Sequence, residues 1–304
     1  MTFDLTPTKP ASTVAGRMFK CIFRQKKKNR ICPELPNLIS KRALVTGGVA
    51  GVGEFISRGL MERGAQVTSL SRGQSSGTGA IPGIHNQYVD LANPETILTA
   101  VELLGNTPFD LLILNAGLVS AKAKQTVTGV ENTFGINVLG HHILYRLLIE
   151  RGLLTKDARI IITTGDIYIS TDDCSPEIPF ETTQKTYARS KLGNLWQVAE
   201  LKNRYPNAYP LAVHPGVVAS GLAGAKTGFS AWLMNKVLVS EKAGAQASLI
   251  AATQNLPRGA YWHNTLGLVD LPADDPALDK EKAARLWEQL EQLAVPYLSR
   301  NPSL

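Results

Sequence analysis

Cysteine is scarce in this sequence, which has three among 304 residues: Cys21, Cys32 and Cys174. They are scattered along the chain, without the short spacings at which cysteines hold zinc. The pattern therefore argues against a disulfide framework and against a zinc site, and we expect no metal ligands. A reducing compartment fits this cysteine usage best.

Long apolar runs are absent as well. A membrane-spanning helix needs roughly 18 consecutive apolar residues, and the longest apolar stretches here, such as Leu111–Leu114, have the length of a strand. With 44% hydrophobic and 19% charged residues, the composition is typical of a soluble globular protein.

The net charge of +7 is concentrated at one end of the chain. Residues 1–42 contain ten Lys and Arg against Asp4 and Glu34, a net of +8, so the remaining chain has a net of −1. Because the body is nearly neutral, a nucleic-acid-binding domain is not indicated, and we expect no nucleic-acid partner.

Residues 1–40 carry no strong fold signal, and we expect a flexible, basic N-terminal extension. Three interpretations stay open: a solvated disordered tail, an interfacial membrane anchor, and a cleaved organelle-targeting leader. The anchor interpretation depends on residues 17–30, which combine aromatic and basic side chains and include Cys21 as an acylation site. The expected location is accordingly the cytoplasm, a membrane surface or an organelle.

From residue 41 onward, strand-like and helical patterns alternate without an internal repeat or a linker. The expected strands are 42–46, 65–70, 87–90, 110–115, 158–164, 208–213 and 260–263. The expected helices are 52–63, 94–104, 128–152, 183–204, 231–253 and 279–295. This alternation predicts one α/β domain over residues 41–304, a single Rossmann-type doubly wound parallel sheet with helices on both faces. In such sheets, ligands bind beyond the carboxyl ends of the strands.

A glycine-rich turn follows the first strand and leads into a helical pattern. It reads Thr46-Gly47-Gly48-Val49-Ala50-Gly51-Val52-Gly53. Glycine adopts unusual backbone angles and lets the chain approach a ligand closely, and the amides at a helix start favour an anion. The turn is therefore a candidate pyrophosphate site.

The residues after the second and third strands bear on the identity of the nucleotide. A site for NAD usually has an acidic residue after the second strand, whereas this sequence has Ser71 and Arg72. An arginine can bind a 2′-phosphate with two hydrogen bonds, so the sequence favours NADP. The alternative is that Arg72 is an exposed loop cation. Asp90 and Leu91 end the third expected strand, where an adenine would lie.

A tyrosine and a lysine lie four residues apart at the start of the 183–204 helix. Tyr187 and Lys191 share one helix face and can converge on one ligand. Free tyrosine titrates near ~10, too high for efficient proton exchange at neutral pH, and a nearby ammonium would lower that pKa. This pair therefore suits proton transfer coupled to hydride transfer.

These features together resemble the short-chain dehydrogenase/reductase family, in order and in separation, over about residues 41–297. The residues that carry the resemblance are the glycine-rich turn, Asn115-Ala116-Gly117 after the fourth strand, Asn137, Tyr187 with Lys191, and Pro215-Gly216 with Ser220. The segments Gly140-His141-His142 and His214-Pro215-Gly216-Val217-Val218 are similar to the branch that contains retinol dehydrogenases.

The resemblance implies a role for each matching residue. Tyr187 would be the general acid/base, Lys191 would bind the nicotinamide ribose and depress the Tyr187 pKa, and Asn137 would hold a proton-relaying water. The other implied cofactor contacts are Thr46, Gly47, Gly51, Val52, Gly53, Arg72, Asp90, Leu91, Asn115, Ala116, Gly117, Pro215, Gly216, Val217 and Ser220. Of these, Val217 and Ser220 would lie near the nicotinamide amide.

One position departs from the family pattern. The serine that polarises the carbonyl should end the fifth strand, where this chain reads Ile161-Ile162-Thr163-Thr164-Gly165. Thr164 matches that position best and keeps a hydroxyl donor. Some branches of the family use threonine, so Thr164 stays a candidate catalytic residue.

We therefore expect an NADP(H)-dependent oxidoreductase. Residues 217–255 would form a substrate cover and 279–295 a C-terminal helix. The apolar segment 221–234 suits a lipophilic carbonyl or alcohol, although ordinary core packing explains it equally well. A homodimer is a candidate assembly.

The main rival is an NADP-binding regulatory protein with little turnover, motivated by Thr164 and the basic extension. An epimerase or dehydratase is disfavoured by the glycine spacing, and reduction of a carbon–carbon double bond stays open.

Overall fold

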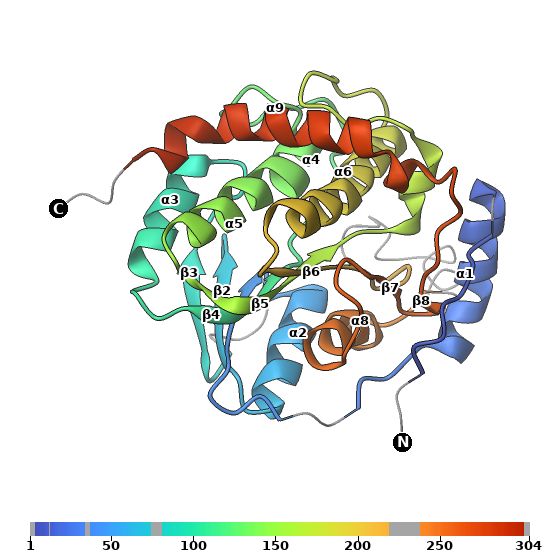
Figure 1. Ribbon diagram of the computed structural model, residues 1–304, viewed down its shortest axis with the longest axis horizontal. Coiled ribbons are helices and arrows are strands. Elements are labelled where there is room, and N and C mark those ends of the chain that lie inside the picture. Colours follow the sequence, from blue (N-terminus) through green and yellow to red (C-terminus); the bar gives the residue numbers. More distant parts are fainter. Residues whose placement is uncertain (1–3, 12, 34–36, 74–80, 219–237, 301–304) are drawn as a thin grey trace.

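The sheet is the frame of the molecule (Figure 1). A computed structural model describes residues 4–11, 13–33, 37–73, 81–218 and 238–300. Within them, eight strands form one sheet in the order β3-β2-β1-β4-β5-β6-β7-β8. The strands are β1 (Arg42–Thr46), β2 (Gln66–Ser71), β3 (Ile84–Tyr88), β4 (Phe109–Leu114), β5 (Leu154–Thr163), β6 (Tyr209–His214), β7 (Tyr261–His263) and β8 (Gly267–Leu268). Strands β1 to β7 run parallel and β8 is antiparallel. The predicted doubly wound sheet is confirmed.

Helices cover both faces of this sheet because its strands are apolar on both sides. In β1, the side chains of Ala43 and Val45 belong to one buried cluster and that of Leu44 to the other. The first cluster packs under α2 (Gly51–Glu62) and α8 (Glu241–Thr253). The second packs under α3 (Pro94–Leu103), α5 (Gly140–Glu150) and α6 (Thr183–Arg204), and α9 (Lys280–Leu298) lies across α5 and α6 in Figure 1.

Several expected boundaries are wrong in detail. The third strand ends at Tyr88, which leaves Asp90 and Leu91 in the following loop. The long helix expected over 128–152 is divided into α4 (Asn132–Phe134), a π-helical turn η1 (Gly135–Leu139) and α5. The helix expected over 231–253 begins at Glu241, and residues 231–237 lie outside the described part. The short strand β8 and the 3₁₀ turns η2 (Asp166–Ser170) and η4 (Pro276–Leu278) were not anticipated.

The N-terminal extension, expected to be flexible, forms part of the folded body where the structure describes it. Helix α1 (Val14–Lys28) packs against η2 beside the β7–β8 edge (Figure 1). Before it, Thr8 pairs in parallel with Val269, donating to the Leu268 carbonyl at 2.8 Å. Contact of residues 17–30 with a membrane surface stays a prediction. No helix in the described ranges is long and apolar enough to span a bilayer.

A buried arginine anchors α1. Arg17 is 2% exposed and donates to the Tyr168 hydroxyl at 2.5 Å and to the Asp275 carboxylate at 2.6 Å, while the Tyr168 hydroxyl also bonds to Asp275. A buried charge is costly unless it has a partner of opposite charge. These partners lie 151 and 258 residues away in the chain, so local sequence patterns could not reveal that the extension docks.

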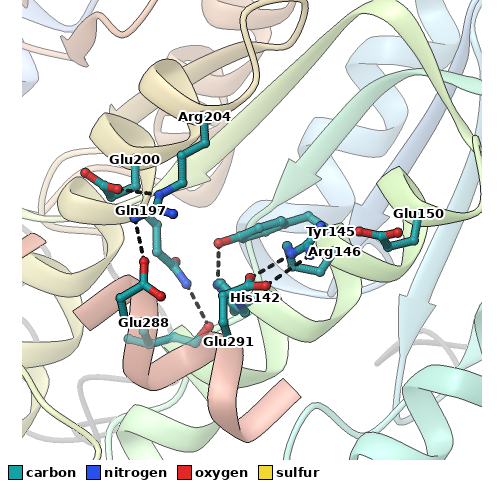
Figure 2. Close-up of polar contacts among 10 residues, drawn as sticks. His142, Tyr145, Arg146, Glu150, Gln197, Glu200, Arg204, Glu288 and Glu291 are labelled. Atoms are coloured by element: carbon teal, nitrogen blue, oxygen red, sulfur yellow. Dashed lines mark hydrogen bonds and ion pairs between the residues drawn. The ribbon is translucent and has the colours of Figure 1, made fainter. Parts of the chain in front are cut away.

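A second polar network fastens α9 to α5 (Figure 2). Glu291 accepts from Arg146 Nε at 2.7 Å and Nη2 at 3.0 Å, and from His142 Nε2 at 2.7 Å. Tyr145 donates its hydroxyl proton to His142 Nδ1, which leaves His142 neutral, and burial lowers the His142 pKa accordingly. Burial alone would raise the pKa of Glu291, but the hydrogen bonds from His142 and Arg146 lower it from 4.5 to about 2.

We predict that Glu291→Gln destabilises the fold by about 2 kcal/mol at pH 7, because Arg146 and His142 lose a charged acceptor. A carboxyl with a lowered folded-state pKa stabilises above its unfolded pKa, and that stability is lost as pH falls from about 4.5 toward 2. Urea unfolding should therefore show a smaller difference between wild type and variant at pH 3.5 than at pH 7.

The matched control is Glu288→Gln on the same helix. Glu288 is paired with Arg204, but its side chain is 60% exposed, so this change should cost less than about 1 kcal/mol. Equal losses in the two variants would contradict a special role for Glu291.

Candidate active site

The glycine-rich turn between β1 and α2 leaves room for an anion. Gly47 and Gly51 have φ of +68° and +55°, which side chains rarely adopt. A Cβ on Gly53 would lie 2.1 Å from the Gly47 carbonyl oxygen, so that position also requires glycine. Ala50 caps α2 without a side-chain hydrogen bond, and the first amides of the helix can therefore bind a ligand. A pyrophosphate fits this arrangement.

Thr46 joins this turn to the end of β4. Its hydroxyl accepts from the backbone amides of Asn115 and Ala116, each at 3.0 Å, and bonds to His141 Nε2 at 3.0 Å. The other nitrogen of His141 lies 3.3 Å from the Asn137 carbonyl. Because Nδ1 donates there, Nε2 accepts from Thr46, and His141 is neutral; burial lowers its pKa to about 3.

The predicted nucleotide residues after β2 and β3 lie at the same carboxyl edge. Arg72 is exposed directly after β2. The Asp90 carboxylate accepts a hydrogen bond from the backbone amide of Ala92 at 3.0 Å. A Cβ on Gly140 would lie 2.4 Å from the Leu91 carbonyl oxygen, so glycine lets this loop pack directly on α5. Val52 is partly buried against the cluster under α8.

Four of the predicted site residues meet at the end of β4: Gly117, Asn137, Tyr187 and Lys191. Lys191 Nζ lies 5.2 Å from the centre of the Tyr187 ring and donates to the Thr163 carbonyl at 3.0 Å. A Cβ on Gly117 would lie 3.6 Å from Asn137 Oδ1 and 3.9 Å from Lys191 Nζ. The structure thus brings together residues that the sequence separates by up to 74 positions.

Asn137 lies in the π-helical turn η1, and its side chain makes three hydrogen bonds. It accepts from the Leu118 amide at 2.8 Å and donates to the Leu118 carbonyl at 2.9 Å and to Ser190 Oγ at 3.1 Å. A π-turn widens a helix locally and is frequent at functional sites. Here it fixes the loop after β4 against α6.

The lowering of the Tyr187 pKa by Lys191 stays a prediction, and in this structure burial shifts both groups of the pair. Burial raises the pKa of Tyr187 to about 12 and lowers that of Lys191 to about 8. Burial is the cause of both shifts, and the Lys191 ammonium donates its hydrogen bond to the Thr163 carbonyl.

Thr164 does not present its hydroxyl proton to the site. Thr164 is 2% exposed, and its Oγ1 donates to the Lys191 carbonyl at 2.8 Å. The next residue, Gly165, is extended with a φ of −171°. A Cβ there would lie 3.8 Å from His214 Nδ1 and 3.9 Å from Lys191 Cγ. The open position beside Lys191 is therefore Gly165, which has no side chain.

A buried Asp–His cluster beside this position was missed by sequence reasoning. Asp166 follows β5, and His214 and His263 pair in register on β6 and β7. Asp166 accepts from His263 Nε2 at 3.0 Å and from the Tyr261 hydroxyl at 2.8 Å. The signal was present, since Asp166, His214 and His263 lie at or shortly after the carboxyl ends of β5, β6 and β7.

The ligand atoms of Asp166, His214 and His263 lie within 4.8 Å of one another, as in a metal site. However, His263 Nδ1 accepts from the amides of Thr265 and Leu266 at 3.0 and 3.3 Å. With Nδ1 accepting, Nε2 must carry the ring proton and donate to Asp166. A protonated nitrogen cannot bind a metal, so the cluster is built as a hydrogen-bonded unit.

The turn after β6 contacts the N-terminal helix. Gly216 has a φ of +89°, and the Gln25 carboxamide bonds to the backbone of Val217. Pro215 is tied to the β7–β8 connection through its carbonyl, which accepts from Asn264. Ser220 and about half of the expected cover, residues 219–237, lie outside the described part. The remainder of that cover is mainly α8, which is a buried core helix.

Comparisons with known proteins agree with this geometry. A family model described as short chain dehydrogenase matches residues 41–168. Human retinol dehydrogenase 13 is 27% identical, with 95% of this chain and 94% of that protein aligned. Human retinol dehydrogenase 12 is 31% identical over 63% of this chain and 66% of that protein. A solved structure of an uncharacterised protein from Mycobacterium paratuberculosis has a TM-score of 0.70 at 27% identity, covering 88% of this chain and 98% of its own.

The chain therefore belongs to the short-chain dehydrogenase/reductase family, a family of oxidoreductases that bind a nicotinamide cofactor. Within that family it falls in the retinol-dehydrogenase-like branch, at low sequence identity.

The buried Lys191 side chain should lower the free energy of unfolding at neutral pH. Since burial lowers its pKa from 10.5 to about 8, the buried ammonium is unfavourable below pH 8. We predict that Lys191→Met stabilises the fold at pH 7 by on the order of 2 kcal/mol. The Thr163 carbonyl keeps its hydrogen bond from Asn194 at 2.9 Å.

Denaturant unfolding at pH 7 and pH 10 tests this prediction. Between pH 8 and 10.5 the unfolded chain binds more protons than the folded one, so wild-type stability rises with pH and the advantage of the variant shrinks. Lys185→Met, at an exposed position of the same helix, should leave stability within about 0.5 kcal/mol. A destabilised Lys191→Met would show that the ammonium contributes more through its hydrogen bond than its burial costs.

Proposed function

We propose that the protein is an NADP(H)-dependent oxidoreductase that interconverts a lipophilic carbonyl compound and its alcohol. The observation that carries the proposal is the meeting of Tyr187, Lys191 and Asn137 at the carboxyl edge of the sheet, beside the glycine-rich turn. This is the place where doubly wound sheets bind ligands, between the loops of β1 and β4.

The chain offers a seat for each part of the cofactor. Gly47, Gly51 and Gly53 would admit the pyrophosphate to the start of α2. Arg72 is exposed directly after β2, where no acidic residue follows the strand. Its guanidinium would bind the 2′-phosphate of NADP. The adenine would lie at Asp90 and Leu91. When bound, the nicotinamide ring supplies or accepts a hydride.

The remaining residues of the cofactor seat follow the end of β4 and β6. Asn115, Ala116 and Gly117 would flank the riboses, with Gly117 leaving space between Asn137 and Lys191. Pro215, Gly216 and Val217 would meet the nicotinamide amide. Ser220 is assigned to the same end by sequence position alone.

Tyr187 would move the proton of the substrate oxygen. With a pKa of about 12 it is protonated at neutral pH, and it can donate to a carbonyl oxygen that becomes an alkoxide. Lys191 would stabilise the resulting phenolate. Asn137 positions both the loop after β4 and Ser190, which lies between Tyr187 and Lys191 on α6.

A lipophilic substrate is supported by the names of the relatives. Two are retinol dehydrogenases, and a putative daunorubicin C-13 ketoreductase from Streptomyces is 25% identical over 83% of this chain and 91% of its own length. Retinol is a mostly apolar alcohol, and a ketoreductase acts on a carbonyl group.

We predict that Tyr187→Phe lowers turnover at least a hundredfold, the usual contribution of a general acid, while NADPH affinity changes little. NADPH consumption would be followed with a panel of retinal, steroid and aromatic carbonyls. The exposed Tyr88, changed to Phe, serves as the control and should retain wild-type rates. Equal rates in the Tyr187 variant and wild type would contradict the assigned role.

A second candidate is an NADP-binding regulatory protein with little turnover. The observation that favours it is the missing carbonyl donor, because Thr164 bonds internally and Gly165 has no side chain. A single such donor is worth about 10²–10³ in rate.

Gly165→Ser separates the two candidates. The extended backbone accepts serine, and its Cβ would meet no atom closer than 3.8 Å. If the protein is an enzyme weakened at this position, Gly165→Ser should raise kcat at least tenfold. The Thr164→Ser control should not, because that hydroxyl still bonds to the Lys191 carbonyl. Tight NADPH binding without turnover in every variant would support the regulatory protein.

A further inference from the structure

The side chain of Gln25 is clamped onto the peptide that follows β6. Gln25 lies on α1, is 1% exposed, and accepts from the Val217 amide at 2.9 Å. Its amide group also donates to the Val217 carbonyl, at 3.3 Å. A Cβ on Gly216 would lie 3.1 Å from Gln25 Oε1, so glycine is what allows this approach. The contact joins residues 192 positions apart.

The group that Val217 binds is a primary carboxamide, and nicotinamide carries the same group. Under the proposed function, on which this inference rests, the nicotinamide amide would pair with this same peptide. Val217 has one N–H, which already bonds to Gln25. Two carboxamides therefore cannot pair with Val217 in this way at the same time.

We propose that helix α1 is an intramolecular competitor of the cofactor, with Gln25 occupying the carboxamide position of the nicotinamide ring. The docked helix is a closed form, and the cofactor binds fully only when Gln25 leaves Val217. The apparent affinity for the cofactor is then the affinity of the open form multiplied by the fraction of protein that is open.

The closed form is held at a second point. Arg17, eight residues before Gln25 and about 12 Å away along the helix, is buried in its ion pair with Asp275. This anchor fixes α1 on the body, so that Gln25 acts at high effective concentration. By contrast, Arg24, Lys27 and Lys28 of the same helix are exposed, and they provide positions for control substitutions.

The test is equilibrium binding of two ligands to the full-length chain, measured by calorimetry. NADPH carries the nicotinamide, whereas 2′,5′-ADP has the adenosine and 2′-phosphate but no carboxamide. Gln25→Ala removes both hydrogen bonds to Val217 and should tighten NADPH binding about tenfold, since two hydrogen bonds are worth roughly 1–2 kcal/mol together. It should leave 2′,5′-ADP binding unchanged. Arg24→Ala should change neither affinity.

A second measurement needs no variant. Hydrogen exchange of the wild-type chain should become faster in residues 14–28 when NADPH is added, and stay unchanged with 2′,5′-ADP. Slower exchange in α1 with NADPH would overturn the proposal.

The outcomes also separate this inference from the proposed function. If NADPH and 2′,5′-ADP each bind, and NADPH binds equally to wild type and Gln25→Ala, competition by α1 is overturned. The proposed oxidoreductase function is not affected by that result. If neither ligand binds to wild type or variant, both the competition and the nucleotide site are wrong.

Discussion

The candidate site depends on the divergence of the two chain segments that follow the paired strands β1 and β4. At this point the chain leaves the two strands toward opposite faces, and the hydroxyl of Thr46 holds the two ends in register through the amides of Asn115 and Ala116. The same hydroxyl reaches His141, whose ring continues to the Asn137 carbonyl. One buried threonine thus links the glycine-rich turn to the π-helical turn, so the two halves of the site are positioned by a common element.

Much of the fold and of this site could be predicted because their signals are local. Strand-length apolar runs alternating with amphipathic segments define the sheet, and the spacing of Tyr187 and Lys191 places both on one face of α6. The helix from Thr183 to Arg204 was predicted to the residue. Glycines at Gly47, Gly51 and Gly53 stand where the backbone allows nothing larger. In each case a few neighbouring residues carry the physical requirement.

The features that escaped prediction depend on contacts between distant segments. Helix α1 has many cations and no partner nearby in sequence, so its docking by Arg17 and Gln25 could not be foreseen. The direction of the Thr164 hydroxyl depends on where α6 places the Lys191 carbonyl. The π-turn at Asn137 needs one extra residue per turn, which no residue type announces. Asp166 and His263 were readable as strand-end residues, but their mutual hydrogen bond requires β5 and β7 to be positioned first.

The ion pair between Arg17 and Asp275 also orders events during synthesis. A ribosome releases the arginine some 258 residues before its carboxylate partner. During that interval α1 has no carboxylate at position 275 with which Arg17 can pair. Because a domain folds as a unit, this ion pair can form only after nearly all of the chain has emerged. The anchor that holds Gln25 on Val217 is therefore among the last contacts available to the growing chain.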